Sequence, residues 1–192
     1  IDSLQTARRA DFCVGYFNLR GWRLLAPAVE CLTGDGERPP CRLLIGMHRP
    51  PEDEIRSLFG RKSDEPIELD APSARRLKTE IVSRFHEQLT IGAPNATDEQ
   101  GLRLLAQHLR EGRVQIKLFL RYPLHAKLYL AHRTDRVTPI HAFLGSSNLT
   151  LAGLKNQGEL NTEVVDYQAT HALAEWFEAR WDDDRCLDVT QD

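Results

Sequence analysis

The 192-residue sequence has no apolar run that approaches the roughly 20 residues of a membrane-spanning helix. Its first residues also lack the basic and then apolar layout of a secretory signal. Internal repeats, low-complexity runs and linker-like stretches are missing as well. These absences exclude a membrane protein and a repeat array, and we expect a soluble, cytoplasmic chain that forms one domain.

Cysteine is scarce, and its spacing excludes two kinds of site. None of the four cysteines, Cys13, Cys31, Cys41 and Cys186, forms a Cys-x-x-Cys pair of the kind that binds zinc. Cys13 and Cys41 lie in or beside apolar stretches that favour strands, and this pattern does not indicate a disulfide framework. We therefore predict buried free thiols.

The sequence also lacks a strong excess of charge of either sign, since its net charge is −3. That value argues against a nucleic-acid binder that relies on overall positive charge. The distribution is uneven, because residues 101–136 hold eight Arg or Lys against two acids and residues 175–192 hold seven acids against two Arg. This pattern is compatible with a polyanion groove on an acidic protein, and equally with solvated helix and loop faces.

Composition and periodicity predict the fold class. A chain of this length that is 41% hydrophobic and 28% charged can bury one sizeable core. Apolar runs and period-two alternation predict strands at residues 11–17, 41–47, 114–120, 124–131, 140–144 and 160–167. Helical spacing predicts helices near residues 24–32, 77–89, 97–111 and 173–181. We expect an α/β fold with a mixed, largely parallel sheet and helices on both faces.

One part of the chain departs from this alternation of strands and helices. Residues 48–112 predict a helical excursion from the sheet, and its first part contains Pro50, Pro51 and Pro66 among many acidic residues. We expect residues 1–192 to form a single domain. Because the sequence begins at Ile1 rather than Met, we also expect this domain to be excised from a longer protein.

Polar residues with the chemistry of an anion site lie at the ends of two predicted strands. His125 and Lys127 are two residues apart within one predicted strand, so the strand period puts both side chains on one face. The next predicted strand ends in Gly145-Ser146-Ser147-Asn148, a turn with hydroxyl, amide and backbone N–H donors. Together the two strand ends predict a site for one phosphate group.

These two motifs, His-Ala-Lys and then Gly-Ser-Ser-Asn, resemble the signature of the phospholipase D-like phosphodiesterase superfamily. The resemblance is clearest over residues 114–167. The phrase Gly-Ser-Ser-Asn-Leu-Thr, followed by Gly153-Leu154 and Glu159-Leu160-Asn161, is most similar to the nuclease-like domains of bacterial helicases and of restriction or defence proteins. The resemblance implies a phospholipase D-like fold and a metal-independent phosphodiesterase, most of all a nuclease that cleaves DNA.

The resemblance also implies roles for individual residues. His125 is expected to be the nucleophile that forms a phosphohistidine, while Lys127 neutralises a non-bridging oxygen of the phosphate. Asn148, Ser146 and Ser147 are expected to donate hydrogen bonds to the bound substrate. Because this covalent route needs no metal and the sequence lacks a compact Asp/His cluster, we predict no metal and no cofactor.

In relatives with one motif, an acidic residue beyond the asparagine holds the nucleophilic histidine in the right tautomer. Glu159 lies eleven residues after Asn148 and is the first candidate, and Glu163 on the following predicted strand is the second. An ordinary surface glutamate at a strand edge would produce the same pattern.

One position departs from the superfamily's fuller motif, which continues from the lysine through four residues to an aspartate. His132 occupies that position, and Asp135 lies three residues later in a connection. The aspartate is mostly a scaffold residue in relatives, and several nuclease-like members lack it. Its absence therefore argues mainly against a lipid-cleaving phospholipase, whose motifs are usually complete and duplicated.

Only one copy of the motif is present, and relatives with one copy dimerise so that the second histidine acts as general acid. We therefore expect a homodimer in which His125 of each chain faces one shared phosphate. The partner is expected to be DNA, with a helicase domain on the C-terminal side of the full-length protein. The alternative is a non-catalytic module that binds nucleic acid or phosphate and positions DNA for that helicase domain.

Overall fold

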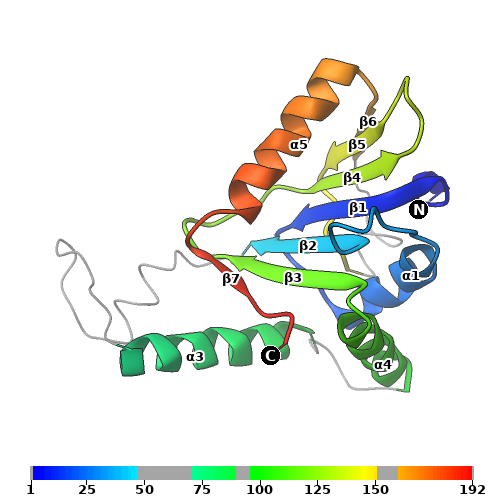
Figure 1. Ribbon diagram of the computed structural model, residues 1–192. Coiled ribbons are helices and arrows are strands. Elements are labelled where there is room, and N and C mark those ends of the chain that lie inside the picture. Colours follow the sequence, from blue (N-terminus) through cyan, green and yellow to red (C-terminus); the bar gives the residue numbers. More distant parts are fainter. Residues whose placement is uncertain (1, 47–70, 90–95, 151–159, 192) are drawn as a thin grey trace.

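A seven-stranded sheet lies at the centre of the computed structural model, which describes residues 2–46, 71–89, 96–150 and 160–191 (Figure 1). Its strands are β1 (Ala7–Val14), β2 (Cys41–Gly46), β3 (Val114–Phe119), β4 (Leu128–Arg133), β5 (Ile140–Gly145), β6 (Asn161–Val164) and β7 (Cys186–Asp188). The described helices are α1 (Leu19–Glu30), α3 (Ala71–Leu89), α4 (Ala96–Arg110) and α5 (Tyr167–Trp181), after the short 3-10 helix η1 (Asp2–Leu4). None of the helices in this part of the chain is both long and apolar enough to cross a membrane.

The strands lie in the order β6-β5-β4-β1-β2-β3-β7, and the sheet is mixed, as predicted. β1, β2 and β3 are parallel, while β4, β5, β6 and β7 pair antiparallel with their neighbours. Parallel pairing is therefore confined to the centre and is less extensive than the sequence predicts. The reason is that β4 begins at the same end of the sheet at which β1, β2 and β3 finish, so it runs antiparallel to β1. Residues 134–139 then join β4 to β5 as a hairpin, which makes this pair antiparallel too.

Helices cover both faces of the sheet, which confirms the predicted α/β architecture (Figure 1). On one face, alternate residues of β1, β2 and β3 pack with α1, α3 and α4 around Phe12 and Trp22. On the other face, residues such as Leu44 and Leu130 pack with Phe177 and Trp181 of α5. The described chain therefore has two apolar cores, one on each side of the sheet.

The first strand begins at Ala7 rather than at residue 11, because its polar residues are buried as an ion pair instead of lying in solvent. Arg9 and Asp11 are 7% and 1% exposed, and Arg9 Nη1 lies 2.7 Å from Asp11 Oδ2. A local pattern cannot distinguish such a strand from a polar loop, since both contain charged residues next to apolar ones.

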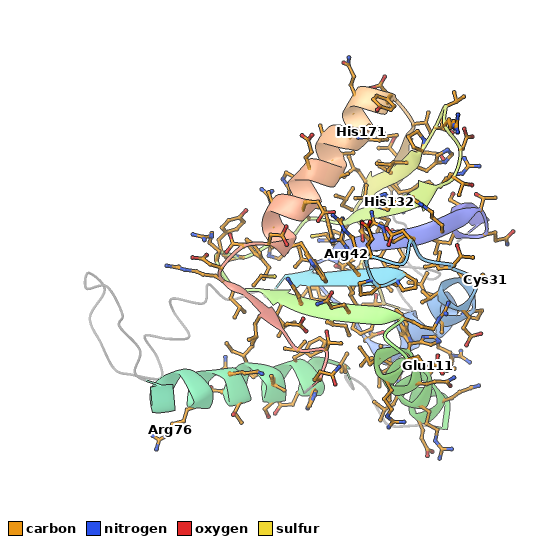
Figure 2. The ribbon with its side chains drawn as sticks, viewed as in Figure 1. Cys31, Arg42, Arg76, Glu111, His132 and His171 are labelled. Atoms are coloured by element: carbon orange, nitrogen blue, oxygen red, sulfur yellow. The ribbon has the colours of Figure 1, made fainter. Side chains whose placement is uncertain are left out.

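Asp11 is the centre of a larger buried ion cluster. It accepts hydrogen bonds from Arg42 Nε (2.7 Å) and Arg42 Nη2 (2.9 Å), and His132 Nε2 lies 2.6 Å from Asp11 Oδ2. Arg42 also donates to the carboxylate of Glu178 at 2.7 and 2.9 Å. The cluster therefore joins β1, β2 and β4 to α5, and Figure 2 shows Arg42 and His132 within it.

The acidic C-terminal stretch contains a strand that the sequence does not predict. β7 pairs antiparallel with residues 117–119 of β3. A three-residue strand is too short to show an alternating pattern, so its formation depends on its partner. Arg121, just after β3, supports this pairing because it forms salt bridges with Asp183 and Asp184 shortly before β7.

The two helices predicted in the excursion are present as α3 and α4, and the contact with α1 decides which residues of α4 are buried. Leu102 of α4 is 47% exposed, whereas Leu105 and His108 are buried. Gly101 lets α4 approach α1, because a methyl group there would lie 2.8 Å from a backbone oxygen of α1. The ring of His108 contacts Trp22 of α1 at 5.6 Å between ring centres. The buried stripe is therefore set by the contact with α1.

The cysteines follow the prediction of buried free thiols only in part. Cys13 and Cys41 are free and buried, and burial raises the pKa of the Cys13 thiol to about 12. Cys186 is half-buried, and Cys31 at the end of α1 is exposed, contrary to the prediction. Cys31 differs because it caps the helix at the surface rather than lying in a strand.

Candidate active site

Two segments of the chain cross the same edge of the sheet, where β1, β2 and β5 end and β4 begins. The first segment, residues 120–127, connects β3 to β4 and so passes over the ends of β2 and β1. Its path over β2 is close, because a methyl group on Gly46 would lie 1.8 Å from the carbonyl oxygen of Leu124. His125 and Lys127 belong to this crossing segment and not to a strand as predicted, since β4 begins only at Leu128. A segment that crosses strand ends has no adjacent strand to pair with.

The second segment is the Gly-Ser-Ser-Asn turn, which runs from the end of β5 toward the residues that follow β1. Leu149 N donates to Tyr16 O (3.2 Å), and Leu149 O accepts from Asn18 N (3.2 Å). Gly21 of α1 permits this approach, because a methyl group there would lie 2.2 Å from Leu149 O. The turn is therefore anchored at the end of β1.

The two segments meet beside Gly15, the residue that follows β1. A methyl group on Gly15 would lie 3.3 Å from Asn148 Oδ1 and 3.7 Å from Lys127 Nζ, so the amide and the ammonium lie against one backbone position. Tyr16 N donates to Asn148 Oδ1 (2.9 Å). This bond orients the amide, and Asn148 Nδ2 becomes the end that can donate to an anion.

His125 is exposed at this edge, two residues before Lys127. Lys127 Nζ donates to the carbonyl oxygen of His125 (2.8 Å), which holds the lysine along its own segment. Lys127 O in turn accepts from Gly145 N (3.3 Å) and ties the first segment to the start of the second. The structure thus brings His125, Lys127 and Asn148 to one edge of the sheet, where an imidazole, a cation and an amide donor can act on one phosphate.

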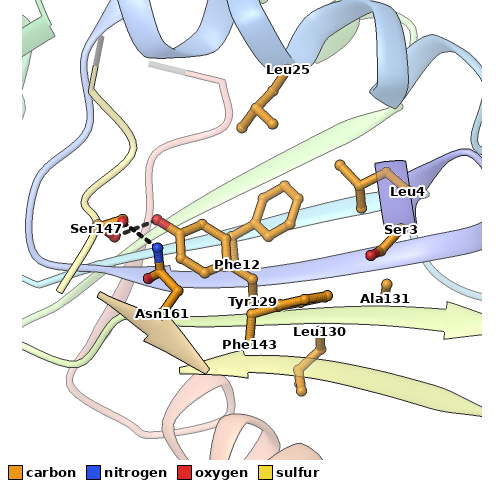
Figure 3. Close-up of a pocket in the computed structure, with 10 residues that line it drawn as sticks. All are labelled: Ser3, Leu4, Phe12, Leu25, Tyr129, Leu130, Ala131, Phe143, Ser147 and Asn161. Atoms are coloured by element: carbon orange, nitrogen blue, oxygen red, sulfur yellow. Dashed lines mark hydrogen bonds between the residues drawn. The ribbon is translucent and has the colours of Figure 1, made fainter. Parts of the chain in front are cut away.

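The two serines of the turn have different surroundings. Ser146 is exposed; its hydroxyl accepts from Leu160 N (3.1 Å), and its own N–H donates to Leu160 O (3.1 Å). Ser147 is 4% exposed, and its hydroxyl accepts from Asn161 Nδ2 (2.7 Å), as Figure 3 shows. The side chain of Ser147 is therefore turned away from the solvent, toward a pocket that it helps to line.

The two acidic candidates differ in what the structure says of them. Glu159 lies outside the described residues, so its role stays a prediction. Glu163 lies on β6, where its carboxylate is 3.0 Å from Nδ1 of His141. The other ring nitrogen of His141 lies 2.8 Å from Arg133 Nη1. Because Glu163 is engaged with a histidine other than His125, Glu159 remains the first candidate for orienting the nucleophile.

His132, which occupies the position of the motif's aspartate, has a carboxylate as its partner. Its Nε2 lies 2.6 Å from Asp11 Oδ2, so the carboxylate is supplied by β1 instead of β4. Asp135 does not take this place, because it accepts hydrogen bonds from Val137 N (2.8 Å) and Thr138 Oγ1 (3.2 Å) in the hairpin turn. The departure from the motif thus lies within the scaffold and leaves the edge with Lys127 and Asn148 unchanged.

Several basic residues of the central stretch are engaged within the protein. Arg121 is paired with two aspartates of the acidic tail, and Lys117 Nζ donates to Trp181 O (2.9 Å) while it lies over that ring. Arg113 donates to three backbone carbonyls at the end of α1 and just beyond it, at 2.8 to 3.0 Å. For these three residues a scaffold role accounts for the charge better than a polyanion groove.

Four residues that shape the site were given no role in it from the sequence. Gly15, Tyr16 and Gly46 determine where the two segments meet, and Asn161 holds the turn. The available signal was a glycine at the end of each of the first two apolar strands, which indicates close approach of another backbone. Tyr16 and Asn161 give no such signal, because Tyr16 acts through a backbone N–H and Asn161 through a contact between β6 and the turn after β5.

A known protein family matches the part of the chain that contains the residues of this edge. A family model described as "Cardiolipin synthase, PLD-like domain" matches residues 41–181, which contain His125, Lys127 and the Gly-Ser-Ser-Asn turn. Among curated proteins, no sequence matches the chain.

Solved structures with low sequence identity share the fold. NucT from Helicobacter pylori gives a TM-score of 0.51 at 12% identity, over 97% of this chain and 86% of its own. Polyphosphate kinase from Porphyromonas gingivalis gives a TM-score of 0.52 at 9% identity, over 98% of this chain and 21% of its own. Nuc from Salmonella typhimurium, a phospholipase D family member, gives 0.49 at 12% identity, over 97% and 86% of the two chains. At these identities, the two matches above 0.5 show a shared fold and nothing further.

Proposed function

Because the chain belongs to the phospholipase D-like phosphodiesterase family, whose domain matches residues 41–181, we propose that it is a nuclease that cleaves DNA. The observation that carries this proposal is the meeting of Lys127 Nζ and Asn148 at Gly15, beside the segment of His125. A cation and an amide donor at one point suit a phosphate that gains negative charge in the transition state.

The proposed reaction has two steps at phosphorus. A ring nitrogen of His125 attacks phosphorus, an N–P bond forms, and the P–O bond to the leaving oxygen breaks as that oxygen takes a proton from a general acid. Water then attacks phosphorus, the N–P bond breaks, and the proton of the water returns to the same acid residue. Lys127, Asn148 and Ser146 hold the non-bridging oxygens throughout. The nucleophile and the charge neutralisation both come from side chains, so the scheme includes neither a metal nor a cofactor.

The general acid in this scheme is His125 of a second copy of the chain. The motif occurs once, and two nearby histidines are engaged elsewhere: His132 with Asp11, and His141 between Glu163 and Arg133. A homodimer with a two-fold axis through this edge would bring two copies of His125 to one phosphate.

The choice of DNA rests on the likeness of the motif to the nuclease-like domains of helicases and restriction proteins. The same likeness supports a helicase domain in the full-length protein. A second candidate function is a non-catalytic module that binds DNA and positions it for that helicase domain. The replacement of the motif's aspartate by His132 is the observation in its favour.

Cleavage of labelled single- and double-stranded DNA in excess EDTA tests the proposal. We expect the wild-type chain to cleave DNA under these conditions and His125→Ala not to. Equal cleavage by both proteins would point to a contaminating nuclease, and cleavage that EDTA abolishes would contradict the metal-independent route. DNA binding without cleavage would support the second candidate function.

Substitution of Gly46 by alanine is expected to lower kcat at least about tenfold, because it displaces the segment that carries His125. The added methyl group would lie 1.8 Å from Leu124 O, and only backbone movement relieves that contact. Gly36→Ala is the control, since a methyl group there meets no atom within 4 Å, although its φ of 82° adds strain. The control should lower the thermal unfolding temperature without changing kcat. A wild-type kcat in Gly46→Ala would show that this crossing does not position His125.

A further inference from the structure

Ser147 lies between two residues that are proposed to contact phosphate, yet its side chain is turned inward. It is 4% exposed and borders a pocket of about 210 Å³ between α1 and the sheet, lined mainly by apolar side chains such as Phe12 and Phe143 (Figure 3). A hydroxyl in such surroundings needs a hydrogen-bond partner from the protein. The contacts of Ser147 therefore show what holds the turn in place.

Side chains from two different strands hold this residue. Tyr129 of β4 donates its hydroxyl to Ser147 O (2.6 Å), and Asn161 of β6 donates Nδ2 to Ser147 Oγ (2.7 Å), both drawn in Figure 3. The Tyr129 ring packs on Phe12 of β1 at 5.6 Å between ring centres, which limits its movement. Both the peptide and the side chain of Ser147 are thus held from the sheet.

The start of β6 contacts the two serines in succession. Leu160 exchanges hydrogen bonds with Ser146, and Asn161 bonds Ser147. Gly145 allows β6 to come this close, because a methyl group there would lie 2.1 Å from Asn161 Oδ1. The turn is therefore coupled to β6 as well as to β5, from which it emerges.

We propose that Asn161 and Tyr129 are positioning residues that act through Ser147 to hold Ser146 and Asn148 in the geometry that binds phosphate. The inference rests on the proposed function, since it concerns the same site. It also assigns Ser147 a role as an anchor of the turn, in place of the direct substrate contact expected from the sequence. Donors that are held in place before the substrate arrives need no rearrangement during the reaction.

A double-mutant cycle of Asn161→Ala and Ser147→Ala tests this coupling through kcat/KM for DNA cleavage. Each single variant should lower kcat/KM about tenfold, because each removes the hydrogen bond between Asn161 and Ser147. The double variant should lower it no further, since both changes remove that same bond. Losses that multiply to about a hundredfold in the double variant would show that Asn161 acts independently of Ser147, and would overturn the inference. Asn161 is exposed, so its truncation should leave the fold intact. Thr162→Ala, its neighbour on β6, is the matched control and should keep the wild-type value.

The same cycle, measured as affinity for inorganic phosphate by calorimetry, separates this inference from the proposed function. Non-additive losses of affinity in a chain that cleaves no phosphodiester would support the positioning role and overturn the function. Additive losses of affinity in a chain that cleaves DNA would support the proposed function and overturn the positioning role. A wild type that neither binds phosphate nor cleaves DNA would overturn both. Tyr129→Phe, which removes only the hydroxyl, should weaken phosphate binding in the same direction as Asn161→Ala.

Discussion

Alanine in place of His125 is expected to lower kcat for phosphodiester cleavage by about 10⁴-fold or more, because it removes the atom that bonds to phosphorus. The covalent step gives a second, independent readout. With a labelled DNA strand, the wild-type chain should retain a labelled strand fragment when the reaction is stopped with alkali, since a histidine N–P bond survives alkali. His125→Ala should retain none.

The matched control for this variant is His86→Ala, an exposed histidine on α3. It should keep the wild-type kcat and the covalent label. If His125→Ala lost activity but kept the labelled fragment, another residue would be the nucleophile and the assignment of His125 would be wrong.

The same variant tests whether the site is shared between two chains. In a mixed dimer of His125→Ala and Lys127→Ala, each shared site would have one histidine and one lysine instead of two of each. Its activity should therefore stay below about a tenth of the wild-type value, since a missing general acid costs roughly 10²- to 10⁴-fold. Wild-type activity of the mixture would contradict the shared site. A wild-type chain that sediments as a monomer and is fully active would contradict it as well.

Replacement of Asp11 by asparagine is expected to lower the free energy of unfolding by about 3–5 kcal/mol, because it leaves buried guanidinium groups without their carboxylate. Asp11 is 1% exposed and contacts Arg9, Arg42 and His132. Water therefore cannot solvate these partners in place of the lost carboxylate. Urea unfolding followed by tryptophan fluorescence measures the change. Asp184→Asn removes an exposed partner of Arg121 and is the control, with an expected cost of at most about 1 kcal/mol. An equally small cost for Asp11→Asn would show that the cluster contributes little to stability.

The ion cluster also determines how stability depends on pH. Burial raises the pKa of Asp11, but hydrogen bonds from His132 and Arg42 outweigh burial and hold that pKa below its ordinary value. The folded state therefore binds a proton less readily than the unfolded state does. The contribution of the ionised Asp11 to the free energy of unfolding is present in full above the ordinary pKa of an aspartate, about 4. It is lost as the pH falls from there toward the lower pKa of the folded state. Wild-type stability should decline through this acid range, and Asp11→Asn should show a shallower decline.

Much of the site was predictable because the motif is local. The spacing of His125 and Lys127, and the Gly-Ser-Ser-Asn turn after an apolar run, are visible without knowledge of any contact. The strand-helix-strand start and the presence of α3, α4 and α5 were predictable for the same reason, since their apolar residues repeat at fixed intervals. Their starts were not: α5 begins at Tyr167, inside the predicted strand 160–167, of which only Asn161–Val164 pairs as β6.

The features that the sequence did not predict belong to residues whose secondary structure or burial depends on a partner far away in the chain. Residues 7–10 of β1 were not predicted as strand, because the charge of Arg9 favours a polar loop until Asp11, Arg42 and His132 are placed together, and β7 exists only because β3 offers it an edge. Ser147 has the same chemistry as Ser146, and only the approach of Asn161 turns it inward.

By itself, the sequence determined which residues are candidates for the chemistry and, apart from β7, in what order the strands and helices follow. Only the tertiary structure decided that Lys127 and Asn148 meet at Gly15, that the carboxylate beside His132 comes from Asp11, and that the turn is held by β6. The Tyr16–Asn148 bond joins residues 132 positions apart, and the Asp11–His132 contact spans 121. Such contacts follow from strand order and register across the whole sheet, which local periodicity does not encode.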